Sequence, residues 1–461
     1  MKYIVFVYEG EGLPVAWHLQ EEGHEVTVGM VTDSTKTLSK SERGTGEEIP
    51  SQKKKRLHLF DQMVTKIPAD ELLEKMEKIA DKQNYFVFCE MNHLFYYAEK
   101  AKAMGFHGNF PTEEDYSYEI DRKKAKDFVA KYYKDINIQE THVFQTIAEA
   151  KRFLKTSYVI WVIKGFDPEA NVFLPEPEQI DVARKQLNQA LDQHKEVYER
   201  SGFLLERFIP NVIEISPQRM YYDGILVATT VFIENKTIGN GNTGYQTGCS
   251  ADLVFPISPD SKIQKIAYPP IVDELAKQHK GLFFWDISLL TDPQTGEIFF
   301  GEFLPNRPGY NPFYSQLAQL PSINYFFEQV IQKKNPFKIG TIAASTRIFN
   351  LNRTSNNRAI MHDVPVTFPE EHKKDIWPMD IYKKNGQMLI CGFDTNLAVI
   401  TGSGDTVTTA VNRLFRTVSL FSSVGKYYRS ESDFLSLDYP TSILNRLHYG
   451  LTHGYFNLRT I

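Results

Sequence analysis

The stretch GLFFWDISLLTDPQTGEIFFGEFLPNR, residues 281–307, carries two apolar runs around the turn DPQTG, a pattern that predicts a β-hairpin. Asp286 and Glu302 lie equally far from Gln294, so symmetric pairing would place their carboxylates opposite each other, with Cβ atoms about 4.5–5.5 Å apart. Two anions so close favour a bound cation, and a hard divalent ion such as Mg²⁺ prefers oxygen ligands. Solvated acids at a sheet edge are the alternative, but each acid lies within an apolar strand. The hairpin therefore predicts a metal site, with the amide oxygen of Asn306 as a further ligand.

Three other features indicate that an anion binds beside this metal. Arg307 follows the hairpin and supplies a guanidinium suited to a phosphate. Lys164 ends the apolar run 158–163, and a lysine near a carboxylate-held Mg²⁺ is typical of a nucleotide site, although such a lysine often only reaches solvent. The loop GNGNTGYQTG, residues 239–248, has four glycines, which let backbone N–H groups turn toward an anion. A flexible hairpin connection is the alternative for that loop.

Composition excludes several classes of protein. Hydrophobic residues make up 42% and charged residues 24% of the 461 residues, as in ordinary globular proteins. The net charge of −5 gives no broad basic surface for nucleic acid, and no apolar run reaches the roughly 18 residues that span a bilayer. Three widely spaced cysteines fit neither a disulfide framework nor a paired metal knuckle. We therefore expect a cytoplasmic protein without nucleic-acid or membrane partners.

The order of the expected strands and helices along the sequence predicts a multidomain protein of α/β and α+β class. Alternating strands and helices over residues 1–115 indicate a parallel α/β domain. Short helices and hairpins follow over 116–335, in two lobes of about 116–200 and 201–335. One hairpin is predicted to turn at Asp223-Gly224. A small α+β domain is expected over 336–430, and an aromatic helical tail over 431–461.

Taken in order, the motifs resemble those of ATP-grasp ligases, and among them the phosphoribosylamine–glycine ligases. The matching segments are KDF with Lys126, VIK with Lys164, LLERFI with Glu206, VIEIS with Glu214, ENK with Lys236, NTGYQTG at 242–248 and EFLPNR at 302–307. The most specific match is NLAVITGSGDTVTTAVNRLF, residues 396–415, followed by GKYYR at 425–429.

The resemblance implies an ATP-grasp fold with an N-terminal Rossmann-like (pre-ATP-grasp) domain and a small C-terminal α+β domain. It also implies an activity: ATP phosphorylates a carboxylate, and an amine attacks the acyl phosphate to form an amide. The cofactors would be ATP and Mg²⁺ (or Mn²⁺), the partners a small carboxylate and a small amine, and the assembly a monomer or homodimer.

The family's functional roles fall on positions of this sequence that match its motifs. The implied metal ligands are Asp286, Glu302 and Asn306, and the implied catalytic residues are Arg307 and Lys164. The implied ATP-binding residues are Lys126, Lys164, Glu206, Arg207, Phe208, Glu214 and Lys236. The implied substrate-binding residues are Gly10, Gly12, Glu90, Thr243, Gly244, Thr247, Gly248 and Asn311.

Departures from the family pattern indicate altered substrates. The first turn reads YEGEGLP, residues 8–14, and brings two acids to a place where the family binds a phosphate. The flap after Lys164 reads GFDPEANVF, and EFLPN is longer than the family's EFN, so Asn306 reaches a metal only if the strand bulges. One alternative is a degenerate member that binds nucleotide in a regulatory or scaffolding role. Another is the glycine ligase itself, which the first turn disfavours.

Overall fold

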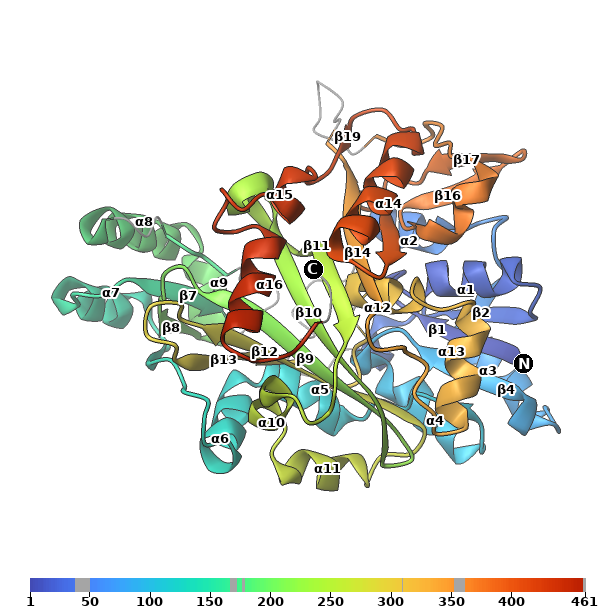
Figure 1. Ribbon diagram of the computed structural model, residues 1–461, viewed down its shortest axis with the longest axis horizontal. Coiled ribbons are helices and arrows are strands. Elements are labelled where there is room, and N and C mark those ends of the chain that lie inside the picture. The colour runs from blue at the N-terminus through green and yellow to red at the C-terminus, as the bar shows by residue number, and fades with distance from the viewer. Residues whose placement is uncertain (38–49, 166–171, 176–178, 309, 352–360, 459–461) are drawn as a thin grey trace.

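The computed structural model describes residues 1–37, 50–165, 172–175, 179–308, 310–351 and 361–458 (Figure 1). Five parallel strands form the N-terminal sheet, in the order β3-β2-β1-β4-β5. The central strand β1 (Lys2–Val7) has neighbours on both sides and is almost wholly buried, which explains its continuous apolar sequence. The predicted Rossmann-like N-terminal arrangement is confirmed. The other strands are β2 (Val26–Met30), β3 (Lys66–Pro68), β4 (Tyr85–Cys89) and β5 (His107–Gly108).

Helices connect these strands and lead out of the N-terminal region. They are α1 (Leu13–Glu21), α2 (Pro50–His58), α3 (Ala69–Glu77), α4 (Phe95–Ala103), α5 (Glu113–Ile120) and α6 (Arg122–Tyr132). Thr112 and Asp115 form a capping box that starts α5, and the carboxylate of Asp121 accepts the backbone N–H of Lys124 at the start of α6. These caps fix where the chain enters the next lobe.

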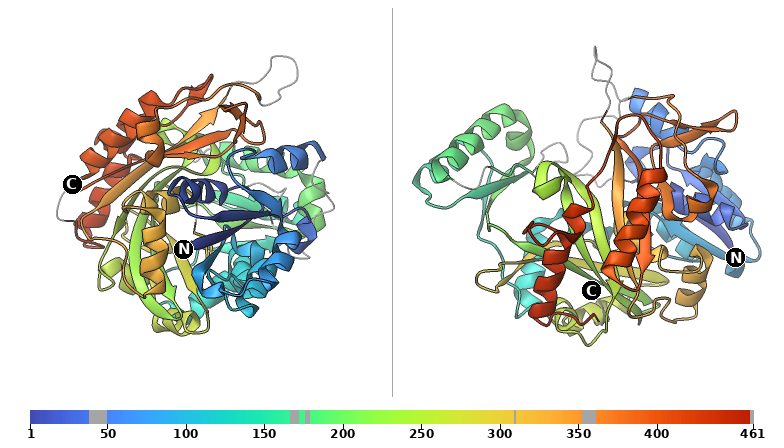
Figure 2. Two further views of the ribbon diagram at one scale, coloured as in Figure 1. Left: turned by 90° about the vertical axis from the view of Figure 1, so that its right-hand side faces the viewer. Right: turned by 45° about the horizontal axis from the view of Figure 1, so that its top comes forward.

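A small lobe follows, built on a three-stranded antiparallel sheet in the order β6-β8-β7. It projects to the left in Figure 1 and to the upper left in the right-hand view of Figure 2. The helical segment over 180–201 is divided at His194. The lobe has an apolar core of its own, separate from the main one. Its elements are β6 (Thr141–Phe144), α7 (Ile147–Thr156), β7 (Trp161–Gly165), α8 (Ile180–Gln193), α9 (Lys195–Ser201) and β8 (Phe203–Arg207).

The largest element is a nine-stranded sheet, in the order β13-β12-β9-β10-β11-β14-β18-β15 with β19 paired to β14. The predicted turn at Asp223-Gly224 is present between β9 and β10, and both residues have positive φ, as a type I′ turn requires. The strands are β9 (Ile213–Tyr222), β10 (Ile225–Gly239), β11 (Thr243–Pro256), β12 (Leu282–Thr291), β13 (Ile298–Phe303), β14 (Ile342–Asn350), β15 (Ile376–Pro378), β18 (Asn396–Gly404) and β19 (Lys426–Tyr427).

This sheet runs across residue 335, where the sequence predicts a domain boundary. Strand β14 pairs with β11 on one side and with β18 on the other. The C-terminal unit is therefore joined to the large lobe by backbone hydrogen bonds as well as by the chain. Its other elements are the hairpin β16 (Ile381–Lys384) and β17 (Gln387–Ile390), and the helices α14 (Val407–Leu420), α15 (Ser432–Leu435) and α16 (Ile443–Thr452).

Four helices complete the structure between and below the sheets. They are α10 (Lys262–Ala267), α11 (Pro270–Ala276), α12 (Tyr310–Leu317) and α13 (Ile323–Ile331). Helix α12 lies on the strands β11, β14 and β18, whereas α13 contacts both α1 and β9. One apolar core consequently extends from the N-terminal sheet into the large sheet and the C-terminal unit.

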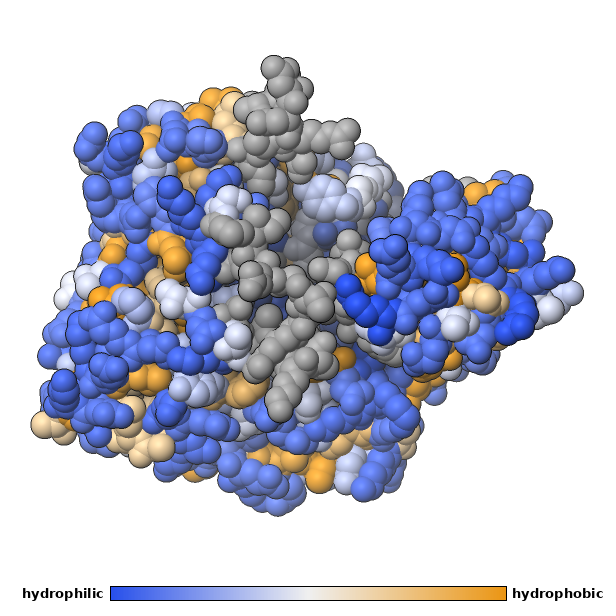
Figure 3. Space-filling view, turned by 180° about the vertical axis from the view of Figure 1, so that it is seen from behind, coloured by the Kyte–Doolittle hydropathy of each residue, from blue (hydrophilic) through white to orange (hydrophobic). Residues whose placement is uncertain are grey.

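Hydrophilic residues cover most of the described surface seen from behind, and apolar residues occur there in small groups (Figure 3). Among the residues that the structure describes, no helix combines the length and the apolar character needed to cross a bilayer.

Candidate active site

A cavity of about 270 Å³ lies on the large sheet and is lined by most of the residues singled out in the hairpin. Five carboxylates face it, whereas only two cationic side chains do. The carboxylates belong to Glu119, Glu214, Glu234, Asp286 and Glu302, and the cations to Lys236 and Arg307. An excess of negative charge in a partly buried space suits a cation.

The register of the hairpin differs from the predicted one. Glu302 pairs with Ser288, and Asp286 comes two residues before Ser288 in β12. The predicted direct opposition of Asp286 and Glu302 is therefore wrong. Two one-residue shifts cause this. Next to the turn Thr291 pairs with Ile298 instead of Glu297, and a bulge at Gly301, which has no partner, adds the second shift. Residues two apart share a face of a strand, so Asp286, Ser288 and Glu302 still line the same cavity.

Lys236 holds two of these acids together. Its Nζ lies 2.7 Å from Oε1 of Glu214 and 3.2 Å from Oε1 of Glu302. The hydroxyl of Ser288 donates to the same oxygen of Glu214. The charge of Lys236 lowers the pKa of Glu302 to about 2, against the opposing effect of burial. Glu302 is therefore ionised at any physiological pH.

The pKa of Asp286 is shifted in the opposite direction from that of Glu302. Its side chain is 3% exposed, and its Oδ1 has no hydrogen-bond partner among the described residues. Burial raises its pKa well above the ordinary value, although a hydrogen bond with Gln218 acts against this. A buried carboxyl with an unused oxygen is costly unless something else binds it.

Arg307 and Asn306 are fixed by residues of α5. Arg307 pairs with Glu119. Burial acts to lower the pKa of Arg307, but Glu119 and Glu11 outweigh it, and the pKa is raised. Asn306 has φ +50°, donates to Oδ2 of Asp115 at 2.9 Å and accepts the N–H of Phe284 at 3.3 Å. Both ends of its amide thus have partners within the protein, and its role as a metal ligand stays a prediction.

The two predicted phosphate lysines meet on one carboxylate in the small lobe. Nζ of Lys126 lies 2.6 Å from Oε2 of Glu206, and Lys164 pairs with the other oxygen. Burial lowers the pKa of Lys164, and the two lysines overcome burial to lower that of Glu206. Arg122, at the start of α6, adds positive charge that acts on both Lys164 and Glu302. Sequence reasoning missed Arg122, which carries no distinctive motif.

The predicted ATP-binding residues Arg207 and Phe208 lie at the end of β8. The backbone N–H groups of Arg207 and Phe208 donate to the carbonyls of Glu140 and Ile160, both at 2.9 Å. The Arg207 side chain is exposed and that of Phe208 is half-buried. These N–H groups are consequently used for holding the lobe together. Most of the flap 165–173 lies outside the described residues.

The glycine-rich loop is the tip of the long β10–β11 hairpin. The hydroxyl of Thr243 donates to the carbonyl of Asn240, and the hydroxyl of Thr247 donates to the carbonyl of Lys236. Gly244 is exposed with φ +82°, whereas Gly248 lines the cavity. Four of the predicted substrate-binding residues thus lie along one hairpin, namely Thr243, Gly244, Thr247 and Gly248. Of these four, only Gly248 lines the cavity.

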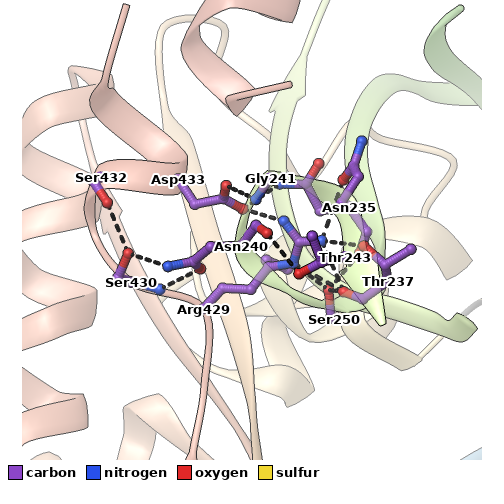
Figure 4. Close-up of polar contacts among 12 residues, drawn as sticks. Asn235, Thr237, Asn240, Gly241, Thr243, Ser250, Arg429, Ser430, Ser432 and Asp433 are labelled. Atoms are coloured by element: carbon purple, nitrogen blue, oxygen red, sulfur yellow. Dashed lines mark hydrogen bonds and ion pairs between the residues drawn. The ribbon is translucent and has the colours of Figure 1, made fainter. Parts of the chain in front are cut away.

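The C-terminal tail fastens this hairpin through a buried ion pair between Arg429 and Asp433 (Figure 4). Arg429 Nε donates to the carbonyl of Thr237 at 3.0 Å and to the hydroxyl of Ser250 at 2.8 Å. Asp433 accepts the N–H of Gly241 at 3.0 Å. The loop tip is therefore held by residues almost two hundred positions away.

Arg347 is a second residue that sequence reasoning missed. It lies in β14, is 5% exposed, and donates from Nε to Oδ1 of Asn311 at 3.0 Å and from its guanidinium to the carbonyl of Thr247 at 2.7 Å. Two predicted substrate residues therefore converge on it. An arginine in the middle of the strand sequence IAASTRIFN was the available signal.

The side chain of Glu90 binds the turn that contains Gly10 and Gly12, at the carboxyl ends of β1 and β4. The carboxylate of Glu90 accepts the N–H groups of Tyr8, Glu9, Gly10 and Gly12, at 2.5, 2.6, 3.3 and 2.5 Å. Burial raises the pKa of Glu90 to about 7 despite these bonds. The turn therefore already holds an anion that belongs to the chain.

A metal set of three or more His, Cys, Asp or Glu side chains is absent from the described residues. The predicted metal site contains two carboxylates and one amide, which is fewer than the three His, Cys, Asp or Glu side chains of such a set. What remains at the hairpin is a pair of carboxylates, one ionised and one with an unused oxygen.

Comparison with known proteins gives structural matches only. No family model matches the sequence, and no curated protein does. Phosphoribosylamine–glycine ligase of Thermotoga maritima matches with TM-score 0.62 and 16% identity, over 94% of this chain and 100% of that one. Biotin carboxylase of Campylobacter jejuni matches with TM-score 0.58 and 13% identity, over 99% and 97%. L-Amino acid ligase of Bacillus licheniformis matches with TM-score 0.51 and 14% identity, over 91% and 98%. The predicted multidomain ATP-grasp fold is confirmed.

Proposed function

We propose that this chain, which has the ATP-grasp fold, is an ATP-dependent carboxylate–amine ligase, similar to phosphoribosylamine–glycine ligase but with other substrates. The observation that carries the proposal is the meeting of Asp286, Glu302 and Arg307 at one cavity of about 270 Å³. The γ-phosphoryl group of ATP passes to a carboxylate with release of ADP. An amine then attacks the acyl phosphate, and an amide and phosphate are formed.

The residues at the hairpin fit a hard divalent cation. Glu302 offers an ionised carboxylate, and Asp286 offers a buried oxygen without a partner. These two residues would hold Mg²⁺ or Mn²⁺, whose contribution is to neutralise charge on the transferring phosphoryl group. Asn306 acts as a positioning residue, because its amide fixes the chain between Asp115 and Phe284.

Cationic side chains supply the remaining charge compensation. Arg307 presents a guanidinium that Glu119 keeps oriented at the cavity wall, where it stabilises the transferring group. Lys126 and Lys164 share one carboxylate, so the three groups keep a net positive charge for the nucleotide phosphates. Such chemistry needs positioning and charge neutralisation more than a nucleophilic side chain. We place the activity in the cytoplasm, where the three free buried cysteines would stay reduced.

The test is ADP release with Mg²⁺ and a panel of amino acids and small amines. We expect metal-dependent ADP formation that requires a carboxylate and an amine together. Glu302→Gln removes the charge but keeps the shape, and we expect at least a hundredfold loss of turnover, as when one electrostatic catalytic group is removed. Glu297→Gln, on the exposed turn of the same hairpin, is the matched control and keeps full activity.

Two outcomes would contradict the proposal. Full turnover in Glu302→Gln would remove the metal assignment. Tight ATP binding without turnover across a broad panel would favour the alternative, a protein that binds nucleotide in a regulatory or scaffolding role.

A further inference from the structure

A second cavity, of about 340 Å³, lies between the turn after β1 and the C-terminal unit. Its wall carries four carboxylates and one guanidinium. The charged residues are Glu9, Glu11, Asp380, Asp394 and Arg347. Such a wall repels an anion and attracts a cation.

Four backbone N–H groups of the turn beside this cavity are already used within the chain. The N–H groups of Tyr8, Glu9, Gly10 and Gly12 all donate to the carboxylate of Glu90, which fills the concave side of the turn. A phosphate would have to displace this carboxylate while facing Glu9 and Glu11. The turn is thus closed to a phosphorylated ligand by the chain itself.

The acids of the cavity outnumber its one cationic side chain, Arg347, among the described lining residues. In the described part of the chain, Glu11 forms no ion pair, and burial together with Glu9 holds its pKa well above the ordinary value. The carboxyl group of Asp380 accepts backbone N–H groups, among them those of Gly392 and Phe393 at 3.0 and 2.8 Å. A cation from outside would relieve this unbalanced charge.

An independent observation points to a ligand with hydrogen-bond donors. Asn396 lines the cavity and is 3% exposed, and its Oδ1 has no hydrogen-bond partner among the residues described. A buried amide oxygen without a partner is uncommon in folded proteins. An ammonium group, which carries three donors and no acceptor, would satisfy it.

The second cavity adjoins the candidate active site. Arg347 lines the second cavity and bonds to Asn311, which lines the first. The charge of Glu11 acts on both Arg307 and Arg347. A ligand held by Glu11 would consequently lie next to the place where the acyl phosphate forms.

We propose that the second cavity binds the amine substrate as a primary ammonium compound that carries no phosphate group. This deepens the proposed function and rests on it for the word substrate. Binding itself depends on Glu11, Asp394 and Asn396, which lie outside the nucleotide and metal positions.

The test measures binding to the full chain without nucleotide, by calorimetry. The probes are 1,4-diaminobutane, a phosphate-free diamine, and ribose 5-phosphate, an anion. We expect saturable binding of one diamine per chain and none of ribose 5-phosphate. Glu11→Gln and Asp394→Asn each weaken diamine binding about tenfold or more, because each removes a charged hydrogen-bond partner. Glu99→Gln, an exposed acid on α4, leaves binding unchanged.

A further variant separates the two cavities. Glu302→Gln changes the first cavity only, so diamine binding survives it if the inference holds. Loss of binding in Glu302→Gln with retention in Glu11→Gln would place the diamine in the first cavity and overturn the inference. Absence of saturable diamine binding, or binding of ribose 5-phosphate, would overturn it as well. Diamine binding in a protein that never turns over ATP would contradict the proposed function and leave this binding site standing.

Discussion

Replacing Asp433 with asparagine removes the only carboxylate paired with Arg429 among the described residues, at a place where both side chains are at most 1% exposed. Breaking a buried ion pair from one side costs about 3–5 kcal/mol, because a charge stays buried without its partner. Arg429 keeps its bonds to the carbonyl of Thr237 and the hydroxyl of Ser250, so we expect the lower end, about 3 kcal/mol. Asp433 also accepts the backbone N–H of Gly241 and the side-chain amide N–H of Asn235. The loss of stability is therefore expected to reach the loop tip.

The assay combines urea unfolding with hydrogen exchange of peptides that cover residues 239–248. A local loss of about 3 kcal/mol corresponds to roughly 150-fold faster exchange, because each 1.4 kcal/mol is a factor of ten. The matched control is Asp438→Asn, which changes an exposed acid of the same tail. Exchange and unfolding in Asp433→Asn that equal those of the control would refute the reasoning.

Three further predictions concern other parts of the chain. Gly281→Ala lowers the free energy of unfolding by about 3 kcal/mol or more, since its Cβ would lie 2.1 Å from the carbonyl oxygen of Gly108. Gly296→Ala has the same φ of +74° but open space around it, and lowers the free energy of unfolding by only about 1 kcal/mol. Thermal unfolding of both variants compares the two losses. Lys164→Met weakens ATP binding about tenfold in calorimetry, because one of two lysines on Glu206 is lost; unchanged affinity would remove Lys164 from the nucleotide site. Glu90 has a pKa of about 7 in the folded chain against an ordinary 4.5, so the native state binds more protons and stability falls as pH rises through that window. Glu90→Gln reduces this slope of the urea midpoint against pH, and an unaltered slope would contradict the assignment.

Local sequence chemistry predicted several features of the fold correctly. The turn at Asp223-Gly224 followed from residues that accept positive φ, and the N-terminal α/β unit followed from its alternating pattern. The register of the 281–307 hairpin did not follow, because the pairing next to the turn is displaced by one residue and the unpaired Gly301 displaces it by one more. The shared face of Asp286 and Glu302 survived, since the shift moved the pairing by an even number of residues.

Contacts between distant segments could not be predicted from one sequence. Glu90 meets the turn after β1 only because β1 and β4 are neighbours in the parallel sheet. Arg347 reaches Asn311 and Thr247 because β14 lies beside β11. The unexpected role of Asn306 has the same origin, since its partner Asp115 belongs to α5.

Because β11 and β14 share backbone hydrogen bonds, the C-terminal unit cannot swing away from the large lobe without tearing that ladder. Among the described residues, the strands of the three-stranded lobe pair only with one another, and the lobe has a separate apolar core. Asn137 is still hydrogen-bonded to β13 of the large sheet, so any movement of this lobe relative to the rest of the molecule pivots where the chain enters and leaves it, near residues 138–140 and 208–212.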